Sequence, residues 1–382
     1  MDWRHFELDD ATVEAIESLR PVLSATEQQA EEERTLPMQA VEALRDAGLF
    51  NVALPREVGG VEATPVFEFE VYEAVSRIST VAGWTLFVGN LHTAIPTVYS
   101  GEEAFQAMWG DGRTALVAGQ YAPMGVGERV DGGLRVSGHY SFGSGISHAN
   151  WVLSGCRVGD EMLGFVTPVE DVQLLDNWFV AGLAGTGSRD YELQDVLVPD
   201  GYWWDWMEPQ SQRGGARYAT HIRSQIAACH SGFALGAGER ALDEVISLAA
   251  TKKRMLQKAT IADRGVFQYD IGRARAQLEA GRAYAVDVLS ELAALQASGD
   301  ALPEGFLDRI HAMATYATEL AVEVSLLAYR HGGGSALRLD SPIQRTLRDV
   351  LAAQQHLYVA DLNYEAFGGQ LIATSAEASL PA

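Results

Sequence analysis

The chain has 382 residues, and its 28 lysines and arginines against 51 aspartates and glutamates give a formal net charge of −23. Hydrophobic residues at 47% and charged residues at 21% are ordinary for a globular protein and exclude wholesale disorder. The negative charge disfavours nucleic acids and anionic membranes as partners, because both present phosphates of the same sign. The length suffices for two or three domains.

Cellular location is suggested by the cysteines and by the N-terminal sequence. Cys156 and Cys229 have no C-x-x-C spacing and are expected to be reduced thiols. The first residues lack the apolar segment of a signal peptide, and no run of about 18 apolar residues predicts a membrane span. We therefore expect a cytoplasmic protein.

Residues 1–113 are predicted to form an N-terminal helical domain. Apolar residues recur at helical spacing, most clearly over 65–78 and in the unusually apolar run 81–98. A proline and paired glycines predict a loop at 54–60, between the helices.

Residues 114–206 are predicted to form a β-domain. Short strand-like runs separated by glycine, aspartate and proline are typical of an antiparallel sheet or barrel. These runs are 115–119, 134–138, 151–154, 162–166 and 195–199. A connector over 201–218 contains Trp203, Trp204 and Trp206, whose role as lid, core or interface the sequence leaves open.

Residues 207–382 are predicted to form a C-terminal helical bundle whose faces also pack against other subunits. The four long helical segments lie near 220–256, 264–297, 303–331 and 341–367. The predicted fold class is mainly α with a central β-domain.

Several common sites are not supported. The chain has no G-x-G-x-x-G after a strand and no P-loop, so a Rossmann or P-loop nucleotide site is not expected. The nine histidines show no metal-ligand spacing, so no metal is expected. The run His331-Gly332-Gly333-Gly334 lacks the G-x-S-x-G that a hydrolase would need.

Three polar residues remain as candidates for chemistry. His92 ends an otherwise apolar stretch, Ser144 lies in Phe142-Gly143-Ser144-Gly145, and His356 lies late in the last predicted helix. Each also has a purely structural explanation, namely a hydrogen-bonded core histidine, a β-turn and a bundle histidine at a subunit contact. The residues alone leave both alternatives open.

Five motifs in chain order resemble the acyl-CoA dehydrogenase superfamily, and the resemblance covers nearly the whole chain. The motifs lie at 47–60, 136–145, 182–199, 264–267 and 345–349. The resemblance implies that family's fold, with N-terminal helices, an antiparallel β-barrel or sandwich, and a C-terminal four-helix bundle.

The sequence departs from the dehydrogenases where the reaction is decided. Those enzymes commonly carry Tyr-Glu-Gly shortly after the Arg-Asp pair, and its carboxylate removes the substrate's α-proton. Here the stretch reads His356-Leu357-Tyr358, and Glu365 lies several helical turns beyond Arg-Asp. His356, Ser144 and the pair Trp84 and His92 instead resemble the two-component flavin-dependent monooxygenases (group D), such as the oxygenase component of p-hydroxyphenylacetate hydroxylase.

This second resemblance implies an oxygenase that uses reduced FMN or FAD and O₂ through a C4a-hydroperoxyflavin. The substrate would be a small aromatic or similar electron-rich molecule, and a separate NAD(P)H-flavin reductase would supply the reduced flavin. His92 and His356 would act as acid or base, and Ser144 would tune the flavin. The resemblance also implies a homotetramer.

The resemblance implies a set of cofactor-binding residues, which comprises Trp84, Phe142, Ser144, Thr186, Ser188, Arg264, Phe267, Gly333, Gly334 and Ser335. The glycine-rich loop would approach a flavin phosphate across a subunit interface. The alternatives are an acyl-CoA dehydrogenase-like flavin oxidoreductase, a catalytically idle flavin-binding homologue, and relatives that oxidise nitrogen or sulfur.

Overall fold

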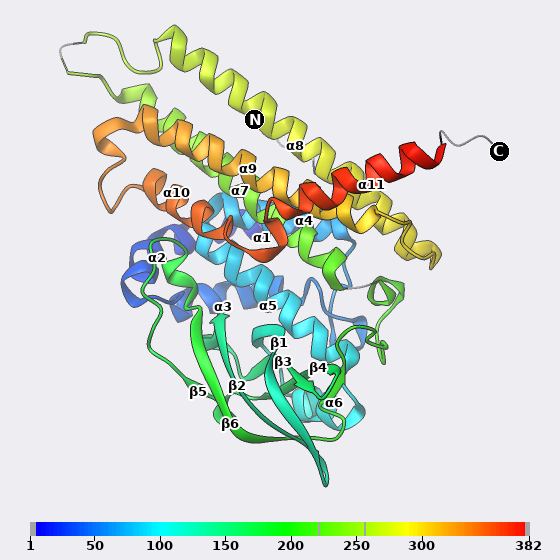
Figure 1. Ribbon diagram of the computed structural model, residues 1–382. Helices are drawn as coiled ribbons and strands as arrows, with labels where there is room; N and C mark the ends of the chain where they lie inside the picture. Colours follow the sequence, from blue (N-terminus) through cyan, green and yellow to red (C-terminus); the bar gives the residue numbers. More distant parts are fainter. Residues whose placement is uncertain (1–4, 221, 256, 379–382) are drawn as a thin grey trace.

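The computed structural model describes residues 5–220, 222–255 and 257–378. Its N-terminal part is helical, as predicted. The helices are α1 (Asp10–Ser18), α2 (Arg20–Glu33), α3 (Met38–Asp46), α4 (Pro65–Ile78), α5 (Thr80–Tyr99) and α6 (Glu102–Trp109). The predicted runs 65–78 and 81–98 correspond to α4 and α5. Helix α5 is buried around almost its whole circumference because it lies between the sheet and the other helices (Figure 1).

A seven-stranded sheet follows, in the spatial order β5-β6-β2-β1-β3-β4-β7. Its strands are β1 (Val117–Val130), β2 (Gly133–Gly143), β3 (Trp151–Val158), β4 (Glu161–Pro168), β5 (Gln173–Leu174), β6 (Arg189–Pro199) and β7 (Trp203–Asp205). All neighbouring pairs are antiparallel except β1 and β3, whose parallel pairing was not predicted. Part of the predicted connector is strand β7, which extends the sheet beside β4.

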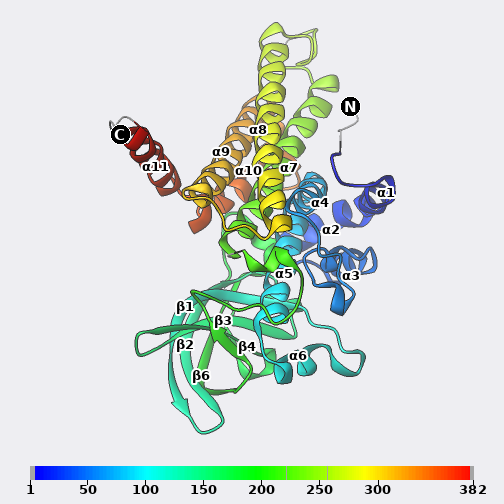
Figure 2. The same cartoon turned by 90° about the vertical axis from the view of Figure 1, so that its right-hand side faces the viewer.

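The C-terminal part is a helical bundle made of α7 (Ile222–Thr251), α8 (Gly265–Ser298), α9 (Phe306–Gly332), α10 (Pro342–Ala353) and α11 (Leu362–Ala378). In Figures 1 and 2 the bundle and the sheet occupy opposite ends of the molecule, with α4 and α5 between them. Two glycines let α4 and α7 approach closely, since a Cβ would lie 2.5 Å from the Phe69 carbonyl oxygen at Gly232 and 2.2 Å from that of Glu73 at Gly236.

The prediction of one continuous last helix near 341–367 was wrong. The helix stops at Ala353, and a turn with the short 3₁₀ helix Leu357–Val359 separates α10 from α11. Polar side chains stabilise this break: His356 Nδ1 accepts the Tyr358 backbone N–H, and the Asn363 side chain donates to the Tyr358 carbonyl. His356 therefore lies in a turn, not on a helix.

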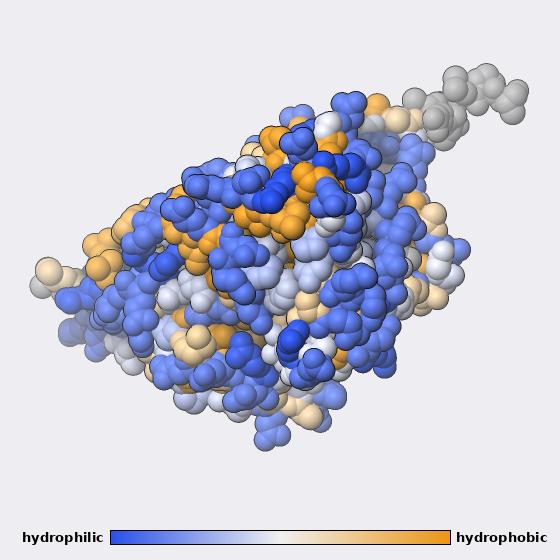
Figure 3. Space-filling view, turned by 90° about the horizontal axis from the view of Figure 1, so that it is seen from below, coloured by the Kyte–Doolittle hydropathy of each residue, from blue (hydrophilic) through white to orange (hydrophobic). Residues whose placement is uncertain are grey.

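Among residues 5–220, 222–255 and 257–378, no helix combines the length and apolarity needed to cross a membrane. The end of the molecule seen in Figure 3 is largely hydrophilic, although hydrophobic side chains gather in one part of this face.

Candidate active site

A chain of hydrogen bonds joins α5 to the sheet and to the loop before β6. The Trp84 indole N–H donates to Ser144 Oγ at 3.1 Å, and Ser144 Oγ lies 2.6 Å from Ser188 Oγ. Ser188 Oγ lies 2.7 Å from the Thr186 hydroxyl, which donates to the Leu183 carbonyl at 2.7 Å. All four polar side chains are buried. The structure therefore brings together four of the predicted cofactor-binding residues.

The direction of this chain follows from its end. Because a carbonyl only accepts, Thr186 uses its proton on Leu183, so the Ser188 hydroxyl donates to Thr186. Ser144 then donates to Ser188 and accepts from Trp84. A hydroxyl oxygen has two lone pairs, so Ser144 keeps one of them as a free acceptor. This position therefore suits a ligand that presents an N–H or O–H group.

Asp349 on α10 anchors the loop that contains Thr186 and Ser188. Its carboxylate accepts the Leu183 backbone N–H at 2.6 Å and the Thr80 hydroxyl at 2.5 Å. Burial raises the pKa of Asp349 to about 6, although both hydrogen bonds act in the opposite direction. At Gly182 a Cβ would lie 1.9 Å from the Arg348 carbonyl oxygen, so the loop packs directly on α10. Sequence reasoning included Asp349 in a motif but missed this role.

His92 is the one residue of α5 that is not fully buried. Its Nδ1 is nonetheless shielded and has no hydrogen-bond partner. Burial lowers the pKa of His92 to about 4, and the neighbouring His356 adds to the shift. A neutral imidazole has one nitrogen with a lone pair, so His92 is available as a proton acceptor near neutral pH.

His356 extends from the turn after α10 toward the indole ring of Trp84. Its ring centroid lies 6.0 Å from that of Trp84 in an edge-to-face arrangement. Because Nδ1 accepts the Tyr358 N–H at 3.4 Å, the proton of the neutral ring is on Nε2. Burial lowers the pKa of His356 to about 4. At neutral pH this histidine is therefore an N–H donor at Nε2.

Tyr358 lies beside His356, and Tyr121 interacts electrostatically with Tyr358. The Tyr358 ring centroid is 5.6 Å from that of His356, and Tyr121 is held by Trp204 and Trp206. The Trp204 indole N–H donates to the Tyr121 hydroxyl and that of Trp206 to the Tyr121 carbonyl, both at 2.8 Å. The sequence had left the role of these tryptophans open, and Tyr121 had not been singled out.

Phe142 differs from its neighbours because it is exposed and its backbone is strained. Its side chain is 64% exposed, and its φ of +66° lies in the left-handed region that non-glycine residues rarely adopt. It contacts the Trp178 ring edge-on at 6.2 Å between centroids. A bulky residue held in this conformation next to Ser144 indicates a functional constraint.

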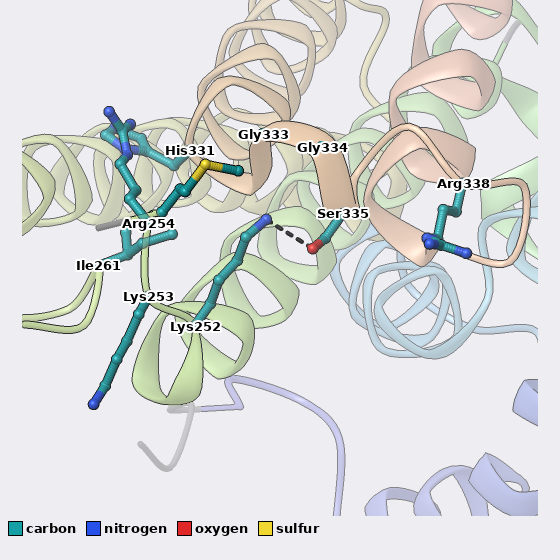
Figure 4. Close-up of a pocket in the computed structure, with 10 residues that line it drawn as sticks. Lys252, Lys253, Arg254, Ile261, His331, Gly333, Gly334, Ser335 and Arg338 are labelled. Atoms are coloured by element: carbon teal, nitrogen blue, oxygen red, sulfur yellow. Dashed lines mark hydrogen bonds between the residues drawn. The ribbon is translucent and has the colours of Figure 1, made fainter. Parts of the chain in front are cut away.

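The remaining predicted cofactor-binding residues lie elsewhere. A pocket of about 480 Å³ opens where the ends of α7 and α9 meet, and it is rich in cations. Its lining comprises Lys252, Lys253, Arg254, Met255, Ile261, His331, Gly333, Gly334, Ser335 and Arg338. Figure 4 shows Lys252 reaching Ser335, with a hydrogen bond of 2.7 Å. Despite the net charge of −23, this pocket is suited to an anion.

Arg264 and Phe267 lie near this cationic pocket rather than near Ser144. Arg264 is the residue before α8, and the buried Phe267 ring packs edge-on against His331 at 5.0 Å between centroids. Figures 1 and 2 place this end of the bundle far from the sheet. One copy of the chain therefore separates the predicted site into a hydroxyl-and-histidine part and a cationic part. No group of three or more metal-ligating side chains occurs in the described ranges.

Comparisons with known proteins identify the family to which the chain belongs. Residues 13–112 match the family described as "Acyl-CoA dehydrogenase, N-terminal domain", and residues 228–361 match "Acyl-CoA dehydrogenase, C-terminal domain". Together these matches span more than half of the chain.

Relatives over nearly the full length are monooxygenase components. The chain is 27% identical to "Flavin-dependent monooxygenase, oxygenase subunit HsaA" of Mycobacterium tuberculosis, covering 90% of each. It is 28% identical to "FADH(2)-dependent resorcinol hydroxylase, oxygenase component" of Rhizobium sp., covering 89% of this chain and 88% of the relative. The fold is similar to that of XiaF from Streptomyces sp., solved in complex with FADH2 and glycerol, with a TM-score of 0.88, 24% identity and 95% of each chain covered.

Proposed function

The chain belongs to the acyl-CoA dehydrogenase superfamily and is the oxygenase component of a two-component flavin-dependent monooxygenase, and we propose that it hydroxylates a small aromatic substrate beside Trp84, Ser144, His92 and His356. The observation that supports this site most strongly is the pair of half-buried histidines with lowered pKa values, of which His356 lies against the Trp84 ring that donates to Ser144 and His92 interacts electrostatically with His356. The dehydrogenase alternative is not favoured by the relatives.

The hydrogen-bonded side chains of Trp84, Ser144, Ser188 and Thr186, here called the hydroxyl chain, fit a reduced flavin. When bound, this cofactor supplies the electrons that activate O₂. The free lone pair on Ser144 accepts an N–H, which reduced flavin carries at N5 and oxidised flavin lacks. Thr186, Ser188 and Trp84 hold the Ser144 hydroxyl in this orientation, and Phe142 provides an exposed aromatic surface beside it.

The two histidines have different roles at the substrate. His92 accepts the proton of an aromatic hydroxyl, which increases the electron density of the ring that is attacked. His356 donates from Nε2 to an oxygen at the reacting centre. Tyr121 and Tyr358 form aromatic walls that suit a planar substrate and exclude water. A relative named as a resorcinol hydroxylase acts on such a phenol.

The cationic pocket is assigned to a flavin phosphate bound by a second copy of the chain. Lys252, Lys253 and Arg338 supply positive charge there, and none of the residues of the Trp84–Ser144–Ser188–Thr186 hydrogen-bond network lines this pocket. FMN and FAD both present a phosphate, so this assignment holds for either. Exposed apolar side chains on and before α11, at Leu357 and Ile372, are available for contacts between copies in a homotetramer.

Two further assignments complete the proposal. Reduced flavin reaches the chain from a separate NAD(P)H-flavin reductase, as the two-component organisation requires. The chain works in the cytoplasm, where the buried thiols of Cys156 and Cys229 remain reduced.

Hydroxylation in an ¹⁸O₂ atmosphere tests the proposal. The chain is mixed with a flavin reductase, NADH, FMN or FAD, and a panel of phenols, indoles and alkyl thioethers. We expect a phenol or indole product that contains one ¹⁸O atom, and a much lower yield with His92→Leu. Unlabelled product, or oxidation of thioethers only, would overturn the assignment of an aromatic substrate.

A further inference from the structure

A third histidine, His230 on α7, contacts the candidate active site from the bundle side. Its ring centroid lies 4.4 Å from that of His356 and 5.3 Å from that of Trp84. The residue is 1% exposed, and neither ring nitrogen has a hydrogen-bond partner. No motif in the sequence pointed to it.

An unpartnered buried imidazole is costly, because its polar atoms lose their hydrogen bonds to water. Phe87 and Phe233 also pack on this part of the indole and histidine cluster, so a phenylalanine at position 230 would suit the packing. Packing alone therefore does not explain the histidine. Its nitrogens indicate a role in hydrogen bonding during the reaction.

The contact with His356 shows where that hydrogen bond is needed. In neutral His356, Nδ1 accepts the Tyr358 N–H. A second proton would turn Nδ1 into a donor facing another donor, so the charged ring needs a different acceptor. A neutral His230 has one nitrogen with a lone pair in direct ring contact with His356.

The surroundings keep His230 uncharged. Burial lowers its pKa well below the usual value, and the titratable groups that add to the shift are His356 and, on α9, His311. From α5, His92 interacts electrostatically with His356, and the α5 side chains that contact His230 are the aromatic rings of Trp84 and Phe87. A proton taken up by the pair is therefore expected on His356 rather than on His230.

We propose that His230 is a positioning residue that accepts a hydrogen bond from His356 whenever His356 takes up a proton during turnover. The inference rests on the proposed function for the origin of that proton, which His92 takes from the substrate hydroxyl and passes to His356, and which leaves with the water that the monooxygenase reaction releases. His230 itself gains and loses no proton.

The test compares His230→Phe, which keeps a ring but has no nitrogen, with His230→Gln, which restores an acceptor. Cys229→Ala is the matched control, because this neighbour on α7 is equally buried and interacts electrostatically with Glu68 and Arg217 instead. The fraction of His356 that is protonated is measured by NMR of the imidazole signals, in the protein without flavin or substrate. The pH is the lowest at which all variants remain folded. His356→Asn assigns its signals.

We expect His230→Phe to lower the protonated fraction of His356 about tenfold, which is equivalent to one pH unit. In His230→Gln and Cys229→Ala this fraction should stay near the wild-type value. In turnover, kcat should fall about tenfold to a hundredfold with KM nearly unchanged, and the acid limb of its pH profile should move. An unchanged His356 titration in His230→Phe would overturn the proposal, even in an active hydroxylase. If the His356 titration shifts in His230→Phe but the protein hydroxylates no substrate, the proposed function is refuted, while the hydrogen bond from His356 to His230 is still supported.

Discussion

Two regions of this molecule bury polar side chains in opposite ways. Between α4, α7 and α8 the buried charges are paired: Glu68 lies 2.6 Å from Arg217, and Arg282 lies 2.6 Å from Glu70 and 2.8 Å from Glu73. Around Trp84 and His356 burial lowers the pKa of His230 and His92, and ring nitrogens of both have no partner. The first region joins elements, whereas the second leaves hydrogen-bonding groups free.

This difference distinguishes buried polar side chains that stabilise the fold from those that are available to bind a ligand. A buried arginine that satisfies two carboxylates, as Arg282 does, joins two helices, α4 and α8, but offers nothing to a ligand. A buried neutral imidazole without a partner contributes little to the fold and keeps its lone pair and N–H available. The location of unsatisfied polar atoms is therefore a better guide to the active site here than the location of charge.

The largest expected effect lies in the paired region. Arg282→Leu leaves Glu70 and Glu73 buried without a counter-charge, so the free energy of unfolding should fall by about 3–5 kcal/mol. Denaturant titration measures the loss. Arg309→Leu is the control, because its partners Asp287 and Glu291 are exposed and such pairs contribute about 0–1 kcal/mol. Equal losses in both variants would remove the distinction between the two regions.

The histidines with lowered pKa values should make the free energy of unfolding decrease as the pH falls. His92 has a pKa of about 4 in the folded chain, below its ordinary value, so its contribution is complete above about pH 6.5 and is lost as the pH falls through 4. At pH 5 the loss is about 2 kcal/mol for this residue. His92→Leu should therefore flatten the dependence of unfolding free energy on pH between 7 and 5.

His139→Gln provides the control for that experiment. His139 is exposed beside Asp190 and Glu192, and its hydrogen bond to Glu192 raises its pKa, so acid does not weaken it. If His92→Leu changes the pH dependence no more than His139→Gln does, His92 is not held uncharged in the folded chain.

A smaller effect is expected for the hydroxyl chain. Ser144→Ala removes the acceptor proposed for the N5–H of reduced flavin, and one hydrogen bond corresponds to about a tenfold change in affinity. The affinity for reduced flavin should therefore fall about tenfold, and that for oxidised flavin should change little. Anaerobic binding titrations measure both, with Ser141→Ala, which loses only a hydrogen bond to Asp190, as the control. An equal loss for both redox forms would contradict the direction assigned to the hydroxyl chain.

The smallest effect is expected at the cationic pocket. Lys252→Ala removes one charge from its lining and should weaken flavin binding about fivefold at low salt and less at high salt. Lys258→Ala in the same exposed loop, which does not line the pocket, should have no effect. Binding titrations at two ionic strengths distinguish the two variants. An equal response would argue against a phosphate at this pocket.

The sequence predicted most of the fold because apolar periodicity and turn residues are local signals. The run 81–98 was recognised as α5, but the break at His356 was missed, since side-chain hydrogen bonds from His356 and Asn363 to backbone groups end the helix there. The parallel β1–β3 pair was also missed, because periodicity does not encode which strands become neighbours.

The site was predicted only in part, for a similar reason. Ser144, His92 and His356 were predicted as site residues through a resemblance, and the structure brings Ser144 and His356 into contact with Trp84. His230 lies in an ordinary helical pattern, so its missing hydrogen-bond partners become visible only when α7 packs on α5.

In the proposed function, the site around Trp84 controls the reaction of reduced flavin with O₂. Stopped-flow mixing of the anaerobic chain and reduced FMN with oxygenated buffer tests it directly. We predict an intermediate whose absorbance spectrum differs from those of reduced and oxidised flavin. It should persist in the absence of substrate and decay faster in Ser144→Ala. Reoxidation at the rate of free flavin in solution, with no intermediate, would contradict the account.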